Sequence, residues 1–223
     1  MDKMQQLPLD LNVRTTSGHG DFLISACNEI AAQWIDRWPD WIGQARALNI
    51  SGPEASGKSH LAAVWQMQSE ARVLASSDLN DMSRFANEHF ILDNVDPQWP
   101  EEALFHLFNR VAAEGGSLLL LSHEPVGQMP WKLKDLASRM RAVNLALIDG
   151  PDDQLLHALM QKNFAERQLV VPDRVVQYLV ARMERSFAAA RDIVGRMDEM
   201  SLARKSEITL RLAREAMSDG NQE

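Results

Sequence analysis

Eight consecutive residues, from Gly52 to Ser59, carry the clearest chemistry in the sequence. They read G-P-E-A-S-G-K-S and match the phosphate-binding pattern G-x-x-x-x-G-K-[ST]. The two fixed glycines let the chain wrap with its N–H groups turned inward, which makes an anion nest at the start of a helix. The lysine of this pattern reaches the β- and γ-phosphates of a nucleotide, and the hydroxyl after it binds Mg²⁺. The nucleotide-binding residues expected from this motif are Gly52, Pro53, Glu54, Ala55, Ser56, Gly57, Lys58 and Ser59.

A second chemical signal is an apolar run at residues 89–92 that ends in the carboxylate of Asp93. In proteins with this phosphate loop, an aspartate at the end of a buried strand holds Mg²⁺. Ser59 and Asp93 are therefore the expected metal ligands. The next residue, Asn94, carries an amide, which orients water but cannot accept its proton. We therefore expect slow hydrolysis by the chain on its own.

Alternating apolar runs and helical segments predict the scaffold that positions these groups. Apolar residues recur at helical spacing in residues 28–38, and helices are also expected over 58–71 and 101–114. Strands that alternate with helices predict an α/β domain with a parallel sheet covered on both faces. The expected strands are residues 47–50, 73–75, 90–92, 118–121 and 143–148. The fourth of them ends in Ser122 and His123, and either residue is a candidate γ-phosphate sensor or part of a solvated strand end.

The strand pattern stops after Gly150, and helical spacing continues from there. Pro172 separates the first two helical periods, Ser186 is the expected N-cap of the third, and the last helix follows Thr209. We therefore expect a nucleotide-binding domain over residues 21–150 and a small α-helical lid domain over 151–223.

The leading segment Q-L-P-L-D-L, residues 6–11, lies in a polar stretch that we expect to be a flexible arm over residues 1–20. Pro8 disfavours a helix or a central strand. In an extended segment Leu7, Leu9 and Leu11 point to one side. The segment is therefore either an edge strand of its own domain or a peptide that docks into a pocket on a partner.

Composition limits the remaining classes of function. The chain has 223 residues, of which 45% are hydrophobic, and a net charge of −8. This charge disfavours a large DNA footprint, which needs clustered Lys and Arg. Cys27 is the only cysteine, so the chain cannot form an internal disulfide. The N-terminus lacks an apolar leader and no apolar run approaches the length of a membrane span, so we expect a cytoplasmic protein without membrane contact.

Several motifs together resemble the DnaA family of AAA+ ATPases. Residues 21–24 with Asn28 resemble the segment that lines the adenine pocket in that family, and G-K-S-H-L at 57–61 continues the P-loop as it does there. The segment D-L-A-S-R-M at 135–140 resembles D-L-x-S-R-[FL], whose arginine is the arginine finger. A-A-A-R-D at 188–192 resembles the lid-helix motif that carries the sensor-2 arginine.

The resemblance implies a P-loop NTPase fold of the AAA+ type that binds ADP or ATP with Mg²⁺. It places Phe22 and Leu23 in the adenine pocket and adds His60 to the nucleotide-binding residues. It also places Arg191 at the bound nucleotide and Arg139 at a neighbour's γ-phosphate. From the residues alone, a solvated surface position is the favoured interpretation of both arginines, and only the resemblance reverses it. His123 departs from the family, whose initiators usually carry Asp there, which weakens a sensing role.

The sequence also lacks two parts with which DnaA initiators bind DNA. About 14 residues separate the second expected strand from the third, too few for the extra helices with which initiators engage origin DNA. The chain also stops after the lid, so we expect no helix-turn-helix domain and no direct sequence-specific DNA binding.

An initiator-like ATPase led by Q-L-x-L-x-L resembles the Hda family of regulatory inactivators of DnaA, whose leading hexapeptide binds the DNA-polymerase sliding clamp. This implies clamp binding through Gln6, Leu7, Leu9 and Leu11. It also implies a DnaA initiator as the second partner, with DnaA-bound ATP hydrolysed through Arg139 supplied in trans. An autonomous motor ATPase, such as a helicase-loader relative, and a pure clamp-tethered adaptor are the alternatives. The bound nucleotide and a homo-oligomer are left open.

Overall fold

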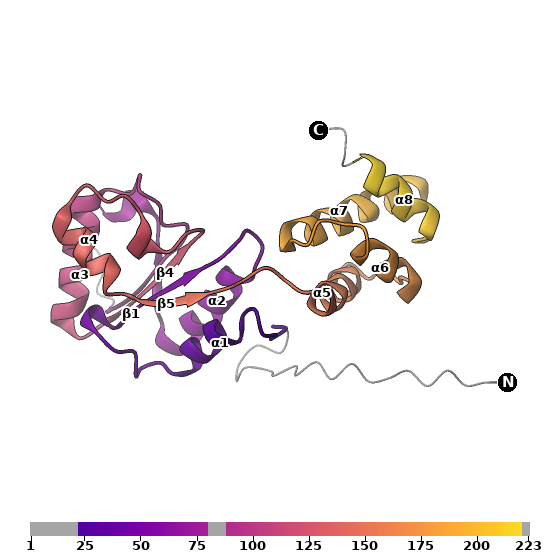
Figure 1. Ribbon diagram of the computed structural model, residues 1–223. Helices are drawn as coiled ribbons and strands as arrows, with labels where there is room; N and C mark the ends of the chain where they lie inside the picture. Colours follow the sequence, from indigo (N-terminus) through magenta and orange to yellow (C-terminus); the bar gives the residue numbers. More distant parts are fainter. Residues whose placement is uncertain (1–21, 80–87, 220–223) are drawn as a thin grey trace.

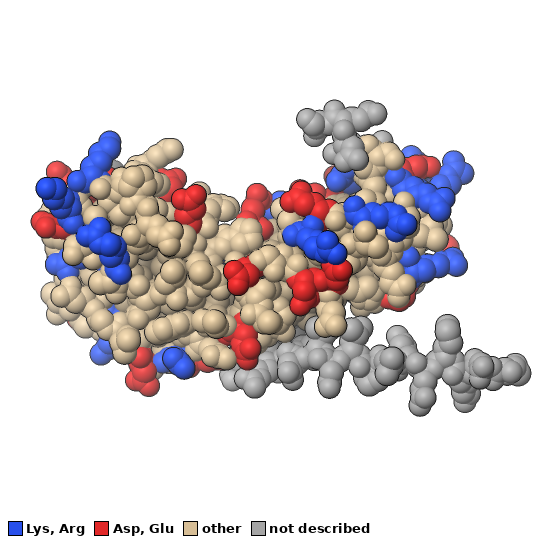
Figure 2. All heavy atoms as spheres, in the orientation of Figure 1, with Lys and Arg blue, Asp and Glu red and all other residues tan. Residues whose placement is uncertain are grey.

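The computed structural model describes residues 22–79 and 88–219 (Figure 1). They form an α/β sheet part followed by a helical region, as the sequence predicts. On the face that Figure 2 shows, Lys and Arg side chains gather at the two ends, over the sheet part and over the last helices. The residues expected to bind the sliding clamp, Gln6, Leu7, Leu9 and Leu11, lie outside the described residues, as does the rest of the expected arm.

Five parallel strands form the central sheet in the order β2-β3-β4-β1-β5. The strands are β1 (Ala47–Ser51), β2 (Arg72–Leu74), β3 (His89–Leu92), β4 (Ser117–Ser122) and β5 (Asn144–Leu147). Each of the five lies where an apolar run predicted it, with ends shifted by about one residue. Because the strands are parallel, their carboxyl ends meet at one edge of the sheet, and the P-loop follows β1 at that edge.

Two pairs of helices cover the two faces of the sheet. The helices α1 (Glu29–Asp36) and α2 (Lys58–Ser69) share one apolar cluster with Leu119 and Leu121 of β4. The helices α3 (Glu101–Glu114) and α4 (Lys134–Arg141) share a second cluster with Leu118 and Leu120. Alternate residues of β4 thus point to opposite faces, and the buried strand reads as an unbroken leucine run. Two short 3₁₀ helices, η1 (Gln44–Arg46) and η3 (Val126–Gln128), precede β1 and follow β4.

Four helices follow the sheet and have an apolar core of their own. They are α5 (Asp153–Glu166), α6 (Asp173–Val180), α7 (Phe187–Arg204) and α8 (Leu210–Asp219). The hydroxyl of Ser186 accepts a hydrogen bond from the Ala189 N–H at 3.1 Å, as expected for the N-cap of α7. Leu155 and Phe187 join the cluster of α1 and α2, so the lid is attached where the P-loop lies. Within residues 22–79 and 88–219, no helix has the length and apolar character needed to cross a membrane.

Candidate nucleotide-binding site

The loop between β1 and α2 is folded as the phosphate motif requires. Ala55 and Gly57 have positive φ angles of 59° and 91°, and α2 begins immediately afterwards at Lys58. A Cβ atom at Gly57 would lie 2.7 Å from the Phe22 ring, and one at Gly52 would lie 2.8 Å from the carbonyl oxygen of Ile148. Both fixed glycines are therefore required by close approach, and Gly57 also by its left-handed backbone.

The ammonium group of Lys58 lies inside this loop. It donates hydrogen bonds to the carbonyl oxygens of Gly52, at 2.8 Å, and Pro53, at 2.7 Å. Burial lowers the pKa of Lys58, and the carboxylates of Asp93 and Glu54 partly oppose this shift. Asp93, at the end of β3, is thus close enough to Lys58 for their charges to interact, which is the juxtaposition that the two motifs predicted.

The remaining loop side chains suit phosphate and Mg²⁺. The hydroxyl of Ser56 is buried and has no hydrogen-bond partner among the described residues, so a ligand oxygen would satisfy it. Ser59 and Asp93 are exposed and offer a hydroxyl and a carboxylate. The described part of the chain contains no cluster of three or more His, Cys, Asp or Glu side chains arranged for a metal ion. Ser59 and Asp93 nevertheless fit Mg²⁺, which is usually held by one or two protein oxygens together with phosphates and water.

Residues 22–28 fold against the start of α2. The Phe22 ring is stacked on the His60 ring, with centroids 5.2 Å apart and planes 19° apart. The Asn28 side chain donates to the Leu23 carbonyl at 2.9 Å and accepts from the Ser25 N–H at 2.8 Å. Phe22, Leu23 and His60 therefore lie beside the P-loop, whereas buried Asn28 holds its own segment in shape.

The lid contributes Arg191 to the same place. Its guanidinium lies 2.9 Å from the Glu54 carboxylate of the P-loop and 3.0 Å from the Asp192 carboxylate. These hydrogen bonds, first to Glu54 and then to Asp192, raise the pKa of Arg191. The predicted lid arginine and the P-loop are thus brought together across the two parts of the chain.

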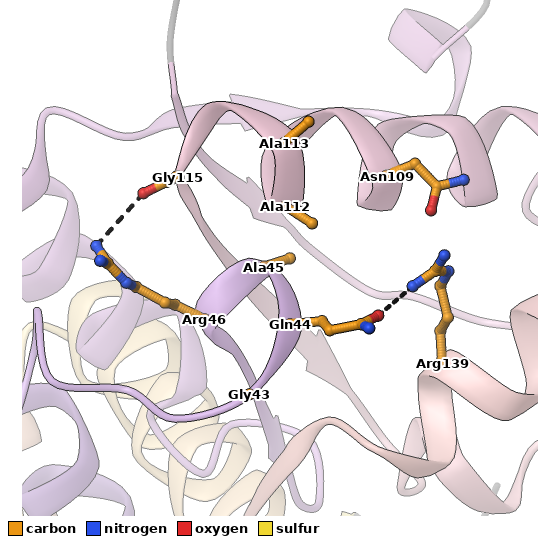
Figure 3. Close-up of a pocket in the computed structure, with 10 residues that line it drawn as sticks. Gly43, Gln44, Ala45, Arg46, Asn109, Ala112, Ala113, Gly115 and Arg139 are labelled. Carbon is orange, nitrogen blue, oxygen red and sulfur yellow. Dashed lines mark hydrogen bonds between the residues drawn. The ribbon is translucent and has the colours of Figure 1, made fainter.

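Arg139 lies elsewhere, near the end of α4 (Figure 3). Its guanidinium stands over the rings of Phe105 and Phe108, 5.2 and 5.4 Å from their centroids, and donates a hydrogen bond to the Gln44 side-chain oxygen. Gln44 precedes β1, whereas the P-loop follows it. Arg139 therefore lies near the amino-terminal ends of the strands, whereas the chain's own P-loop lies at their carboxyl ends. The length of β1, about 13 Å, separates the two.

Sequence reasoning missed Asn49, a buried polar residue in the middle of β1. Its amide donates to the Leu120 carbonyl at 3.0 Å and the Ser122 hydroxyl at 2.9 Å, and it accepts from the Val126 N–H at 3.0 Å. The Ser122 hydroxyl is therefore buried in a network, while His123 is exposed at the tip of β4. The available signal was one amide among the apolar residues of the run A-L-N-I, residues 47–50.

Comparisons with known proteins found matches to the lid by itself and to most of the chain. Residues 152–217 match the family model for the lid domain of Hda. The fold is similar to domain III of the replication initiation protein DnaA from Thermotoga maritima, with a TM-score of 0.73 and 17% identity over 89% of this chain and 94% of that chain. AMPPCP-bound DnaA from Aquifex aeolicus matches with a TM-score of 0.62 and 15% identity over 82% of this chain and 67% of that chain.

A relative was also found by sequence. An uncharacterized protein from Haemophilus influenzae is 24% identical over 180 residues, covering 72% of this chain and 77% of that protein. The solved structures show the fold, and the family-model match describes the lid over residues 152–217. The chain therefore has a fold like that of DnaA domain III, and its lid is similar to the lid domain of Hda.

Proposed function

We propose that this chain regulates replication initiation by stimulating hydrolysis of the ATP held by a DnaA initiator. One observation carries the proposal: Arg139, on the surface of α4, lies near the amino-terminal ends of the strands, and the chain's own P-loop lies at their carboxyl ends. An arginine in this position cannot serve its own nucleotide but can reach one on a neighbouring subunit. A finger supplied in trans stabilises charge in the transition state and accelerates hydrolysis by about 10³–10⁵.

The chain's own nucleotide site has a different part in the proposal. The P-loop places the unpartnered Ser56 hydroxyl and the nearby Arg191 where they would contact phosphates, and two related DnaA structures contain the nucleotide analogue AMPPCP. We infer that ADP or ATP binds here, with Ser59 and Asp93 as Mg²⁺ ligands. The metal would neutralise phosphate charge when bound. Because Asn94 follows Asp93, no carboxylate at that position can take a proton from water, so the bound nucleotide mainly stabilises one arrangement of sheet and lid.

The sliding clamp is the proposed platform, and this part of the proposal rests on the sequence of the leading segment. Gln6 would fill a small polar pocket, and Leu9 and Leu11 an apolar groove. A short docking peptide of this kind reaches only about micromolar affinity, near −8 kcal/mol. A ring with repeated pockets raises the local concentration of the chain near an initiator on the same DNA.

The central experiment measures hydrolysis of DnaA-bound ATP with and without this protein and a DNA-loaded sliding clamp. Wild type should accelerate hydrolysis, and Arg139→Ala should abolish the acceleration while nucleotide and clamp binding persist. Arg141→Ala is the matched control, because Arg141 is an exposed arginine on the same helix. If Arg139→Ala stimulates as well as wild type, the chain is a tether rather than an activator. Substantial DNA-stimulated turnover by the chain alone would instead indicate a motor.

The docking segment has its own test. Replacing Gln6, Leu9 and Leu11 with alanine should abolish clamp binding in a surface-plasmon assay without changing nucleotide affinity. Stimulation should fail at ordinary concentrations and return in part when the protein is in large excess. Normal clamp binding by this triple variant would restore the edge-strand interpretation of the segment.

A further inference from the structure

Three side chains from other parts of the chain hold the guanidinium of Arg139. It stands over the rings of Phe105 and Phe108. The Gln44 side-chain oxygen accepts one of its N–H groups (Figure 3). Gln44 is 95 residues away in sequence. The aromatic faces attract the cation and the amide oxygen fixes one edge of it, so together they restrict both its position and its orientation.

The turn that carries Gln44 has an unusual backbone. Gly43, Ala45 and Arg46 all have positive φ angles, of 89°, 54° and 36°. Residues with a Cβ rarely adopt this conformation, which costs free energy and recurs at functional sites. The Arg46 side chain supports the turn by donating to the Gly115 carbonyl at 3.3 Å. The strained turn directs the Gln44 side chain at Arg139.

Arg139 also borders an open hollow of about 480 Å³ on the molecular surface. The hollow is lined by the η1 turn, the end of α3 and Arg139 itself, and Asn109 points toward the guanidinium across it (Figure 3). Arginine has five N–H donors in a planar fork. The bond to Gln44 engages only one edge of the fork, so other donors remain for an approaching phosphate.

We propose that Gln44 is a positioning residue for Arg139, which it holds through a neutral acceptor. This inference rests on the proposed role of Arg139 as a finger in trans. A glutamate at position 44 would form a stronger bond to Arg139, but it would also neutralise the positive charge that the γ-phosphate needs. An amide fixes the guanidinium and leaves its charge intact. The two aromatic rings serve the same end, because they carry no net charge.

The test uses two variants of the full-length protein with opposite chemistry at one position. Gln44→Met keeps the length of the side chain and removes the acceptor, whereas Gln44→Glu keeps the acceptor and adds a negative charge. In single-turnover hydrolysis of DnaA-bound ATP on a DNA-loaded clamp, both should lower the maximal rate about tenfold. The concentration that gives half of the maximal rate should stay within about twofold of wild type, because the interface itself is unchanged. Equal melting temperatures would confirm that both variants fold.

A second measurement reports on Arg139 without any partner. The side-chain Nε–H resonance of Arg139 in an ¹⁵N NMR spectrum, assigned through Arg139→Lys, should show a restrained group in wild type and in Gln44→Glu. In Gln44→Met the same resonance should show a mobile Arg139 side chain. A maximal rate unchanged in both variants would overturn the inference. An increased rate in Gln44→Met would also overturn it, because Gln44 would then restrain the finger from acting.

The outcomes separate this inference from the proposed function. If Arg139→Ala retains full stimulation, the function assigned to Arg139 fails, whatever the Gln44 variants do. If Arg139→Ala is inactive while Gln44→Met is fully active and its Arg139 resonance is unchanged, the finger stands and the positioning role fails.

Discussion

Replacing Arg191 with alanine should weaken nucleotide binding about 10- to 100-fold and leave the stability of the free protein almost unchanged. The Arg191–Glu54 pair joins the lid to the P-loop at 2.9 Å, but its side chains are 48% and 64% exposed. Exposed ion pairs contribute only about 0.2–1 kcal/mol to stability. A hydrogen bond from a guanidinium to a charged phosphate is worth about 1.5–3 kcal/mol, which corresponds to a roughly 10- to 100-fold change in Kd.

The partner substitution should have the opposite effect. The Glu54 carboxylate competes with nucleotide phosphates for Arg191, and it adds negative charge beside Lys58. Glu54→Gln removes the negative charge beside Lys58 and weakens the bond to Arg191, because a neutral amide is a poorer acceptor than a carboxylate, while it keeps the size of the side chain. Because an exposed pair is worth at most about 1 kcal/mol, the affinity for ADP or ATP should rise only about two- to fivefold.

The measurement is a double-mutant cycle. ADP and ATP are titrated calorimetrically, with Mg²⁺, into wild type, both single variants and the double variant. The gain from Glu54→Gln should shrink in the Arg191→Ala background, since the carboxylate then has no arginine to occupy. Arg185→Ala is the matched control, because Arg185 pairs with Asp153 at 2.8 Å on the exposed surface of the lid. Wild-type affinity in Arg191→Ala would refute the role of this arginine. If Glu54→Gln raises the nucleotide affinity equally in wild type and in Arg191→Ala, then Glu54 acts only by repelling the phosphates.

Three further predictions concern the same domain. Lys58→Ala should abolish most of the nucleotide-dependent rise in Tm, which for wild type corresponds to about 2.7 kcal/mol at 100 times Kd; an undiminished rise would remove the P-loop from the nucleotide site. Asn49→Ala should lower the free energy of unfolding by about 1–3 kcal/mol in urea, because the buried Val126 N–H loses its acceptor; an unchanged midpoint would show that Asn49 is dispensable. Cys27 should react slowly with iodoacetamide near neutral pH, because burial raises the pKa of its thiol and fewer thiolates are present until the pH is higher. Bound nucleotide should slow the labelling further, since Cys27 belongs to the segment beside the P-loop, and faster labelling would contradict that placement.

The sheet could be predicted because its pattern is local. The β4 sequence S-L-L-L-L-S is apolar at every interior position, as expected for a central parallel strand covered on both faces. The helix α3 has the predicted bounds, since its apolar face repeats at helical spacing and Gly115, at a φ of 73°, ends it. Each of these elements is specified by its own residues, so no information about distant segments was needed.

The P-loop could be predicted for the same reason, since its chemistry is encoded in eight consecutive residues and in the strand and helix that flank them. The juxtaposition of Arg191 with Glu54 is different, because these residues are 137 positions apart. Motif resemblance placed both near the nucleotide. Their direct pairing depends on the angle at which the lid meets the sheet domain, and no short segment specifies that angle.

The surroundings of Arg139 show where prediction from sequence ends. The motif D-L-A-S-R-M identified the arginine, but its partners come from η1 and α3, which the fold brings together only after the sheet has formed. The residue types of Ala45 and Arg46 did not predict a left-handed turn, because glycine or asparagine usually occupies such positions. The energetic cost of that turn is met by tertiary contacts such as the bond from Arg46 to Gly115. A glutamine in a strained turn therefore acquires a function only through the position of a distant helix, and its role can be recognised only from the structure.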